Sequence, residues 1–595
     1  MTSVGNGHIA TNVFSDTVYM NGLYNGRNGE SHRARIPAYA NVRLNSTLPP
    51  QQYGPIYSLD IKNGVFQVKV NRERSVVTQR VYAHRFYTRA IINQIEVVYK
   101  PHAGNSYMTH SNIITDPNFI HHEIWIAVHL MPGDNSKDIN FESPVPEIVD
   151  GRAVWSVCGQ TKEVEDPTYQ PEPSKVCMYW TSVPDHLVVP QHGSRTFTFA
   201  MTVDKNKTVA RREFLKGTYF LYSFQSKIVQ GIWYYLLSSL PADHTNQPAE
   251  QYYGLSPTGL ARGGSFDDYE GHNFWDTETW MFPPILLLYP RHAHALLQYR
   301  LNNAYVAEEL AKATGNKGYR FPWESAFTGI EVTQPCCPEV AEFEQHVTGC
   351  ISFAARQYLA VTRNEEWLKV HTYITSRTIQ SQHTLYLLHR YVACLCKPYY
   401  NSMDPDRWAE IAWSLALPYD QRLNYHPQFE GYKRGEKIKQ ADVVLLGYPL
   451  QSTRANDLTY YETVTRESGP AMTWGMHAAG HLQLDEEDKA ASLFNKSYRG
   501  FVREPFKVWS ELRRPKVGAV NFLTGMGGFL QALIFGYAGI SIHLDRLVIT
   551  RPRVPPGSRG FKIRGRCFLL RDGISYGLRR QREGTCTFKR LNVLP

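Results

Sequence analysis

Four segments in the second half of the chain place carboxylate side chains beside aromatic rings. They are residues 271–280, 321–325 with Glu331 downstream, 426–442 and 504–511. Aromatic rings stack on the apolar faces of a sugar, while carboxylates, amides and ammonium groups pair with its hydroxyls. Glycosidic cleavage also needs two carboxyl groups, one to protonate the leaving oxygen and one to act as base or nucleophile. The four segments therefore favour a site for a polar, hydroxylated ligand.

Each segment also has a plain structural interpretation. A Trp followed by an acidic residue is often a core ring beside a carboxylate that caps a helix. Glu331 and Glu504 fit the ordering of loops or helix starts, and Lys439 fits a surface lysine. Residues 525–528 form a Gly-rich run that lacks the Lys-Ser/Thr of a phosphate-binding loop, which favours a tight turn before a helix. Residue types and spacing alone thus indicate a ligand site without fixing its chemistry.

The distribution of charge argues against a nucleic-acid-binding protein. The 595 residues carry a formal net charge of +10. Residues 551–595 hold 12 Lys and Arg against Asp572 and Glu583, so this tail carries the whole excess and residues 1–550 are neutral overall. A body without a basic bias offers no electrostatic footprint for DNA or RNA. We expect the tail to be solvated or poorly ordered.

The nine cysteines predict neither a disulfide framework nor a zinc site. Their number is odd, their spacing is irregular, and no Cys-x-x-Cys occurs. The first residues lack the basic and apolar regions of an export signal, and no apolar run is long enough to span a membrane. We therefore expect a cytoplasmic protein without a membrane partner. The residues imply no metal and no organic cofactor.

Short β-forming runs separated by Pro, Gly, Asn and Asp occupy residues 1–215. The pair Asn63-Gly64 between two such runs predicts a hairpin. Further strands are expected at residues 76–82, 90–99, 124–128 and 197–203. So many short strands predict a large antiparallel sandwich.

Helical periodicity begins near residue 211 and is clearer from Pro290 onward. Leu297, Leu301 and Ala304 follow the i, i+4, i+7 pattern of one helix face, and Gly315 fits a C-cap. Further elements are expected as helices over residues 385–395, from Asp404-Pro405 onward and through residues 470–540, and as a strand at residues 547–550. The candidate ligand residues then lie on loops of a helical domain, a common arrangement for functional sites.

Four motifs narrow the choice of protein family. They are NGLYNG at residues 21–26, Trp275-Asp276, KQADVVLLGYP at residues 439–449 and NFLTGMGG at residues 521–528. With them, the chain resembles glycoside hydrolase family 65 from about residue 10 to about residue 550. The resemblance implies a multidomain fold with an N-terminal β-supersandwich over 1–210, a helical linker over 211–245, an (α/α)6 barrel over 246–540, and a truncated C-terminal β segment with the basic tail over 541–595.

The resemblance also implies roles for individual residues. Glu511 matches the general base that activates water for inverting cleavage, and phosphorylases of the family lack this base. Glu511 therefore favours hydrolysis over phosphorolysis. The implied ligands of the non-reducing glucose are Trp275, Asp276, Lys439 and Gln440. The second aromatic–carboxylate segment adds two candidate sugar-binding residues, Trp323 and Glu324.

The chain departs from the family at the general acid. That acid is a Glu within Pro-Asp-Glu-Tyr-His, and no such segment lies between His346 and His426. The interval is also short by about one helix pair, so the barrel is expected to be incomplete. Losing general-acid assistance costs about 10²–10⁴-fold in rate.

The implied reaction is the removal of glucose from glucosyl-galactosyl-hydroxylysine of collagen, so the expected partner is a glucosylated glycopeptide or a disaccharide. Because the acid is missing, we expect the activity to be impaired. The alternatives are a catalytically inactive carbohydrate-binding protein, and a disaccharide phosphorylase or trehalase of the same family.

Overall fold

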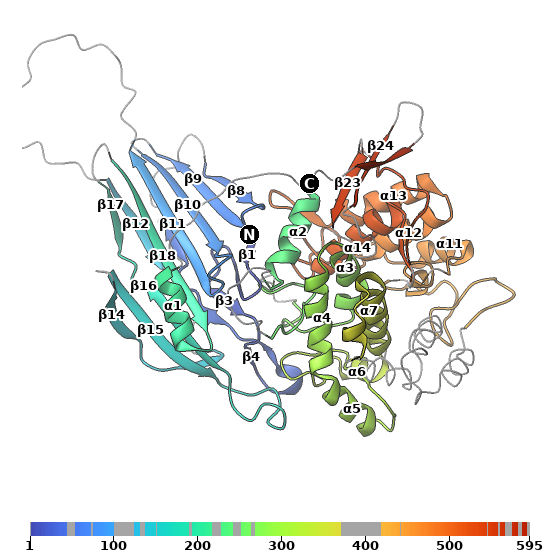
Figure 1. The fold of residues 1–595 in the computed structure, drawn as a ribbon, viewed down its shortest axis with the longest axis horizontal. Coiled ribbons are helices and arrows are strands. Elements are labelled where there is room, and N and C mark those ends of the chain that lie inside the picture. The colour runs from blue at the N-terminus through green and yellow to red at the C-terminus, as the bar shows by residue number, and fades with distance from the viewer. Residues whose placement is uncertain are drawn as a thin grey trace, which may run out of the picture. The chain divides into compact units, whose positions relative to one another are not determined.

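The computed structural model describes the chain with several gaps. The described residues are 2–44, 54–72, 75–99, 124–130, 137–149, 152–189, 193–216, 228–241, 251–262, 268–344, 346–369, 418–440, 442–450, 452–543, 546–556, 558, 560–565, 574–580 and 586–591. The chain forms two compact units, one mostly β and one mostly helical (Figure 1). The first unit comprises Met1–Asn25, Arg33–Val164 and Glu172–Pro248, and the second comprises Gly26–His32, Glu165–Pro171 and Ala249–Pro595.

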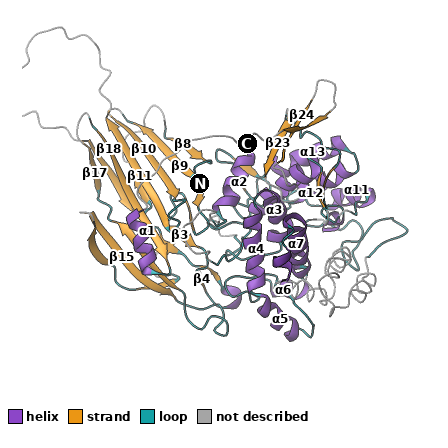
Figure 2. Cartoon of the chain, viewed as in Figure 1, coloured by secondary structure: helices purple, strands orange, loops and turns teal. Residues whose placement is uncertain are grey.

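A nine-stranded antiparallel sheet forms the centre of the first unit (Figure 2). In spatial order its strands are β13 (Ile139–Phe141), β15 (Arg152–Thr161), β16 (Lys175–Thr181), β18 (Ser194–Asp204), β11 (Ala90–Tyr99), β10 (Ser75–Ala83), β9 (Val65–Asn71) and β8 (Ile56–Asp60), and β14 (Val145–Val149) pairs with β15. One smaller sheet contains β1 (Ser3–Gly5), β2 (Ile9–Asn12), β3 (Thr17–Met20) and β6 (Ile36–Pro37). Another contains β17 (His186–Val189), β12 (Ile124–Leu130) and β7 (Val42–Leu44), and β4 (Tyr24–Asn25) pairs with β5 (His32–Arg33).

Alternating side chains of the large sheet build cores on both of its faces. Successive strand residues point to opposite faces. Ile91 of β11 therefore packs with Ile9 and Val18 of a smaller sheet, while Ile92 packs with Phe214 of α1 (Lys207–Lys216). The smaller sheets cover one face and α1 covers part of the other (Figure 1). This packing confirms the expected antiparallel sandwich, and α2 (Ile228–Ser238) follows α1 along the chain.

The hairpin forms at Asn63-Gly64 as the sequence predicts. Asp60 of β8 pairs with Val65 of β9, and Gly64 has a φ of +70° that suits glycine. Asp60 Oδ1 accepts the backbone N–H groups of Lys62 and Asn63 at 3.1 and 3.0 Å, which holds the turn. The other four expected strands lie within β10, β11, β12 and β18, so they are confirmed as well.

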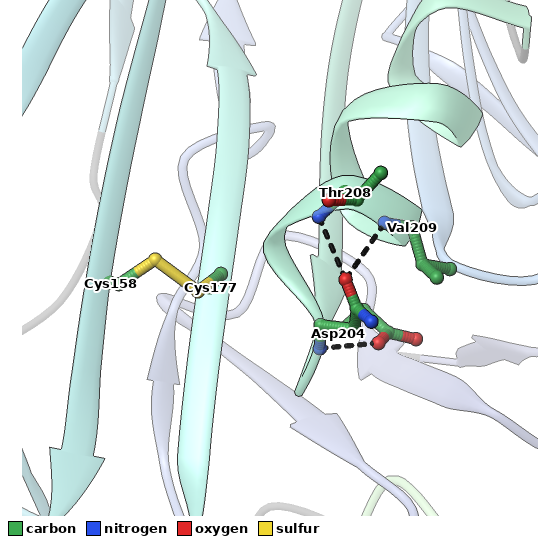
Figure 3. The surroundings of a disulfide bond; sticks show 6 residues. Cys158, Cys177, Asp204, Thr208 and Val209 are labelled. Carbon is green, nitrogen blue, oxygen red and sulfur yellow. Dashed lines mark hydrogen bonds between the residues drawn. A yellow bond between two sulfur atoms is a disulfide. The ribbon is translucent and has the colours of Figure 1, made fainter.

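The first unit contains a disulfide that the cysteine pattern did not predict. Cys158 on β15 and Cys177 on β16 are bonded, with their Cα atoms 4.1 Å apart (Figure 3). The strand register places the two residues directly opposite each other, and register cannot be read from a sequence separation of 19 residues. The cysteine pattern argued against a disulfide framework, and it gave no sign of this single bond. Asn206 Oδ1 accepts the backbone N–H groups of Thr208 and Val209 and caps the start of α1. Figure 3 labels the two donors, Thr208 and Val209.

The second unit consists mainly of helices (Figure 2). The helices η2 (Thr277–Met281), α3 (Phe282–Leu288), α4 (Pro290–Asn302) and α7 (Val347–Thr362) pack together, and α12 (Thr473–Gln483) packs with α13 (Glu487–Arg499), α14 (Leu523–Gln531) and η5 (Ala532–Tyr537). Further elements are η1 (Asn28–Glu30), α5 (Ala304–Ala313), α6 (Pro338–Phe343), η4 (Asp442–Leu446), α11 (Ala455–Val464), and the strand pairs β19 (Val502–Arg503) with β20 (Val508–Trp509) and β21 (Ile540–Ile542) with β22 (Leu547–Ile549). In the part of the chain described here, no helix is long and apolar enough to cross a membrane.

Two helical expectations need correction. The stripe of Leu297, Leu301 and Ala304 is divided between α4 and α5, because the backbone leaves the helical conformation at Asn303. Residues 525–528 lie inside α14 and do not form a turn before it. The helices expected over residues 385–395 and from Asp404 onward lie outside the described residues.

The C-terminal tail also differs from its expectation. Instead of a poorly ordered end, it forms an antiparallel sheet of β23 (Gly560–Gly565), β24 (Ile574–Arg580) and β25 (Cys586–Leu591). β-forming residues such as Phe561, Ile563 and Tyr576 are interspersed among the basic ones. The charge count concealed this pattern.

Two short segments of the N-terminal sequence belong to the second unit, residues 26–32 and 165–171. Glu165 is 2% exposed and accepts hydrogen bonds from the Ser31 hydroxyl at 2.6 Å and the Thr328 N–H at 2.8 Å. One buried carboxylate thus ties the two segments to a loop of the second unit.

Candidate active site

A buried ion pair fixes the loop that ends in Trp275 and Asp276. Arg300 and Glu278 are each 2% exposed, and their Nε and Oε1 atoms lie 2.9 Å apart. Arg300 Nη2 also donates to the Phe274 carbonyl oxygen at 2.9 Å. Each buried charge is satisfied by the other, and removing one partner would leave the other uncompensated. The backbone immediately before Trp275 is therefore held in one conformation.

Glycines allow α14 to approach this loop closely. A Cβ on Gly527 would lie 2.4 Å from the Trp280 carbonyl oxygen, closer than real Cβ atoms come. Without a side chain, the backbone of α14 packs directly against η2. The Thr524 hydroxyl in the first turn of α14 then donates to Asp276 Oδ1 at 2.9 Å. The glycine-rich helix thereby orients the Asp276 carboxylate.

Glu511 follows β20 in a loop that binds its own carboxylate. The Glu511 N–H donates to the Ala519 carbonyl oxygen at 2.8 Å, and the Ala519 N–H donates to Glu511 Oε2 at 3.2 Å. Gly518 has a φ of +56°, and a Cβ there would lie 2.8 Å from Glu511 Oε2. Glycine is required at this position by both the turn and the close approach.

The structure brings Asp276, Lys439 and Glu511 together. Lys439 Nζ lies 3.8 Å from Glu511 Oε1. Burial raises the pKa of Asp276 to about 6, and the negative charge of Glu511 adds to this shift, while the Thr524 hydrogen bond and the positive charge of Lys439 oppose it. Two acidic side chains therefore share the field of one ammonium group.

Tyr269 belongs to this group, although the sequence did not single it out. Burial, followed by the negative charges of Glu511 and Asp276, raises the pKa of its hydroxyl well above the usual value, and a hydrogen bond to Glu511 contributes. A neutral phenol that donates to Glu511 helps to orient that carboxylate. The available signal was the place of Tyr269 two residues before Gly271, at the edge of the first aromatic–carboxylate segment.

Two tryptophans flank His346. The ring centroids of Trp275 and His346 are 4.2 Å apart, and those of Trp323 and His346 are 5.7 Å apart. Trp275 and His346 also line a cavity of about 230 Å³, whose walls include Phe353 and Asp442. Pockets for drug-sized ligands measure about 300–1,000 Å³, so this cavity suits a smaller chemical group.

Glu324 is held by protein groups. It is 6% exposed, and its Oε2 lies 2.8 Å from His272 Nδ1. The backbone N–H groups of Trp323 and Glu324 donate to the Glu331 carboxylate at 2.7 and 3.1 Å. Glu331 thus orders the loop, as expected from its structural interpretation. If Glu324 binds a sugar, its carboxylate does so while it is also in contact with His272.

Gln440 and Asp442 lie side by side on the segment that begins with Lys439. Gln440 Nε2 donates to Asp442 Oδ1 at 3.3 Å, and Gln428 Nε2 donates to Asp442 Oδ2 at 3.1 Å. Asp442 was visible in the sequence only as part of the longer motif. Within the described ranges, no group of three or more His, Cys, Asp and Glu side chains could hold a metal ion.

Comparison with known proteins identifies the family. Residues 243–374 match the glycosyl hydrolase family 65 central catalytic domain. The protein-glucosylgalactosylhydroxylysine glucosidase of Gallus gallus is 33% identical, and the match covers 92% of this chain and 83% of that protein. The chain belongs to glycosyl hydrolase family 65. The Dictyostelium discoideum protein of the same name is 31% identical, with 100% of this chain and 89% of that protein covered.

The family 65 chain is therefore a glycosidase, as the motifs indicated. A kojibiose hydrolase from Flavobacterium johnsoniae is 33% identical over 48% of this chain and 47% of that protein. A solved structure provisionally named a kojibiose phosphorylase from human microbiome has a TM-score of 0.66 at 14% identity, and the match covers 100% of this chain and 93% of that one. The two share a fold with an N-terminal β part followed by a helical part.

Proposed function

We propose that this chain is an inverting α-glucosidase that removes glucose from glucosylgalactosylhydroxylysine, the group in the names of its Gallus gallus and Dictyostelium discoideum relatives. Glu511 is the general base. The observation that carries the proposal is the 3.8 Å contact between Lys439 Nζ and Glu511 Oε1, next to Asp276. The proposed glucose-binding residues are Trp275, Asp276, Lys439, Gln440, Trp323 and Glu324.

The geometry of Glu511 supports its role as a base. Its Oε2 accepts the Ala519 N–H, while its Oε1 is 3.8 Å from Lys439 Nζ, beyond direct hydrogen-bond distance. A carboxylate oriented by the Ala519 N–H and the Tyr269 hydroxyl is able to take a proton from a water molecule that attacks the anomeric carbon. An ionised Asp276 accepts hydrogen bonds from sugar hydroxyls beside the Trp275 ring.

Replacing the base tests this reaction. Glu511→Gln should lower glucose release from a collagen-derived glycopeptide by about 10²–10⁴-fold, because the amide cannot accept the proton of water. Calorimetry should still detect glucose binding to the variant. The matched control is Glu504→Gln, an exposed carboxylate of the same segment, which should release glucose at the wild-type rate. A Glu511→Gln variant as active as the wild type would reject the proposal.

Glucose binding without turnover is the second candidate. It is favoured by the absence of the Pro-Asp-Glu-Tyr-His segment between His346 and His426. It predicts that calorimetry detects glucose binding to the wild type, that Asp276→Ala abolishes this binding, and that no glycoside releases glucose. Measurable turnover by the wild-type chain rejects this candidate.

We also propose that the helices of residues 246–540 form an (α/α)6 barrel that lacks one helix pair. The mutual packing of α3, α4 and α7, and of α12, α13 and α14, supports this arrangement. The other proposed domains are the β-supersandwich over 1–210, the linker over 211–245 and the C-terminal segment over 541–595. A crystal structure would test the number of helices directly.

A cytoplasmic location stays a proposal, and one observation weighs against it. The Cys158–Cys177 disulfide suits an oxidising compartment, because glutathione and thioredoxin keep most cytosolic thiols reduced. Trapping of free thiols in intact cells, followed by a count of blocked cysteines, distinguishes the two locations. Two protected cysteines in this pair would favour an oxidising compartment.

A further inference from the structure

The proposed hydrolysis needs a second carboxyl group that gives a proton to the leaving oxygen. Three acidic side chains around the site already hold strong partners. Glu278 is paired with Arg300 at 2.9 Å, Glu324 is paired with His272 at 2.8 Å, and Glu331 accepts backbone N–H groups of its own loop. The carboxylate oxygens of these three residues are therefore already held by groups of the protein.

Asp276 is unsuited for a different reason. The acid and base of an inverting glycosidase stand on opposite sides of the sugar, about 6.5–9.5 Å apart. The charge of Glu511 acts on Asp276, Lys439 acts on both, and Asp276 accepts the Thr524 hydroxyl. Asp276 therefore belongs to the cluster that contains the base.

Asp442 has no charged or backbone donor as a partner among the described residues, and the contacts around Glu511 do not include it. It is exposed, and it lines the cavity that Trp275 also lines. Among the described residues, its hydrogen-bond donors are the neutral amides of Gln428 and Gln440, at 3.1 and 3.3 Å, and it forms no ion pair. It begins η4 three residues after Lys439, so one short segment carries both a partner of the base and this open carboxyl group.

We propose that Asp442 donates the proton to the leaving glycosidic oxygen, an assignment that rests on the proposed hydrolysis. As the bond from C1 to that oxygen breaks, the Asp442 proton moves to the oxygen. Water adds to C1 from the opposite side and gives a proton to Glu511. Solvent then returns a proton to Asp442 and takes one from Glu511, so one water is consumed for each glucose released.

The charges around the cavity support this role. Desolvation by the apolar residues that line the cavity with it raises the pKa of Asp442 to about 6, and the negative charge of Glu344 adds to the shift, while the charge of His346 and the two amides oppose it. Burial raises the pKa of the Cys350 thiol in the same cavity to about 12, so that thiol stays neutral. A carboxyl group with a pKa near the working pH is partly protonated there, as a general acid requires.

α-Glucosyl fluoride separates the acid from the base, because fluoride leaves without being protonated. Asp442→Asn should lower kcat/KM for the glycopeptide by about 10²–10⁴-fold, yet keep fluoride hydrolysis within a few-fold of the wild type. Glu511→Gln should lose both activities. The matched control is Glu430→Gln, an exposed carboxylate on the neighbouring loop, which should keep both.

The pH profile of the wild type provides a second measurement that needs no variant. Glycopeptide hydrolysis should fall as the pH rises above about 6, where Asp442 loses its proton. Fluoride hydrolysis should show no such fall. If both profiles fall together, Asp442 is not the donor.

Other outcomes separate this assignment from the proposed function. An equal loss of both activities in Asp442→Asn would indicate a binding or structural role and overturn the assignment, and so would full glycopeptide activity in that variant. Wild-type hydrolysis of the fluoride but not of the glycopeptide would reject Asp442 as donor and leave Glu511 as base. Wild-type hydrolysis of neither would reject the proposed function itself.

Discussion

Asp276 shows how the site opposes the stability of its own fold. Burial raises its pKa to about 6, while Lys439 and the Thr524 hydroxyl hold it back from a larger shift. A sugar hydroxyl needs the ionised carboxylate as an acceptor, so function requires the form that burial disfavours. Perturbed carboxyl groups of this kind concentrate at functional sites.

Asp276→Asn should therefore stabilise the protein in a pH-dependent way. The pKa of Asp276 is raised from 3.8 to about 6 in the folded state. Because the folded state binds this proton more tightly than the unfolded state, the wild type loses stability as the pH rises from about 4 to about 6. The loss persists at higher pH. Near pH 8 the free energy of unfolding of Asp276→Asn should exceed that of the wild type by on the order of 1–3 kcal/mol. Near pH 4 the two proteins should be equally stable. Urea titrations at both pH values measure this. A variant that is less stable near pH 8 would contradict the burial argument.

Single residues were partly readable from the sequence. Asp276, Lys439 and Glu511 could be selected because carboxylates beside aromatic rings, and the motifs around them, are visible along the chain. Their partners could not be selected, since Thr524 lies 248 residues from the Asp276 that it contacts. Tyr269 is one of 37 tyrosines, and nothing in its residue type distinguishes it. Contacts between distant segments decide such partners.

At the scale of elements, α14 shows packing overriding local preference. Glycine is unfavourable inside a helix, by about 0.5–1 kcal/mol relative to alanine. α14 nevertheless contains Gly525, Gly527 and Gly528, because each faces a backbone or side chain that a Cβ would meet within 3 Å. The sequence therefore predicted a turn, and tertiary contact produced a helix.

Gly527→Ala should destabilise the protein although alanine is the better helix former. The new Cβ would meet the Trp280 carbonyl oxygen at 2.4 Å, and overpacking of this kind costs about 1–3 kcal/mol. Displacement of α14 also moves Thr524 away from Asp276, so glucose affinity should fall. The control is Gly54→Ala, where no atom lies within 4 Å of the added Cβ. Equal melting temperatures for both variants would show that α14 does not pack this closely.

Strands and hairpins were the elements that local chemistry could predict. Asn63-Gly64 places its turn correctly because the Asp60 side chain and a positive φ at Gly64 act within five residues. The break between α4 and α5 at Asn303 could not be predicted, because Leu297, Leu301 and Ala304 keep the spacing of a continuous helix. Local signals thus specified turns better than helix ends.

At the scale of the whole molecule, the disulfide of the first unit carries a prediction. The bond closes a loop with a sequence separation of 19 residues, and a cross-link of that size stabilises by roughly 3 kcal/mol. A reducing agent should lower the melting temperature of the wild type. It should leave the Cys158→Ser/Cys177→Ser double variant, which starts lower, unchanged. Calorimetry with and without reductant measures both. An unchanged wild-type melting temperature would show that the bond does not stabilise the fold.

The order of β and helical parts was visible in the sequence, but the division into units was not. Residues 26–32 and 165–171 sit within stretches that read as part of the β region, and both belong to the second unit. No composition shift marks them. The Glu165 contacts with Ser31 and Thr328 join positions too far apart for any pattern to connect.

The placement of residues 26–32 and 165–171 in the second unit limits how the protein can be cut into fragments or recombined. The chain passes five times between the units, at residues 25, 32, 164, 171 and 248. A fragment that starts at residue 249 would lack two of its own building blocks, including the Glu165 carboxylate. Recombination between relatives at residue 249 would likewise join the helical part of one protein to residues 26–32 and 165–171 of another. The two parts of the chain are therefore expected to stay together when sequences are exchanged.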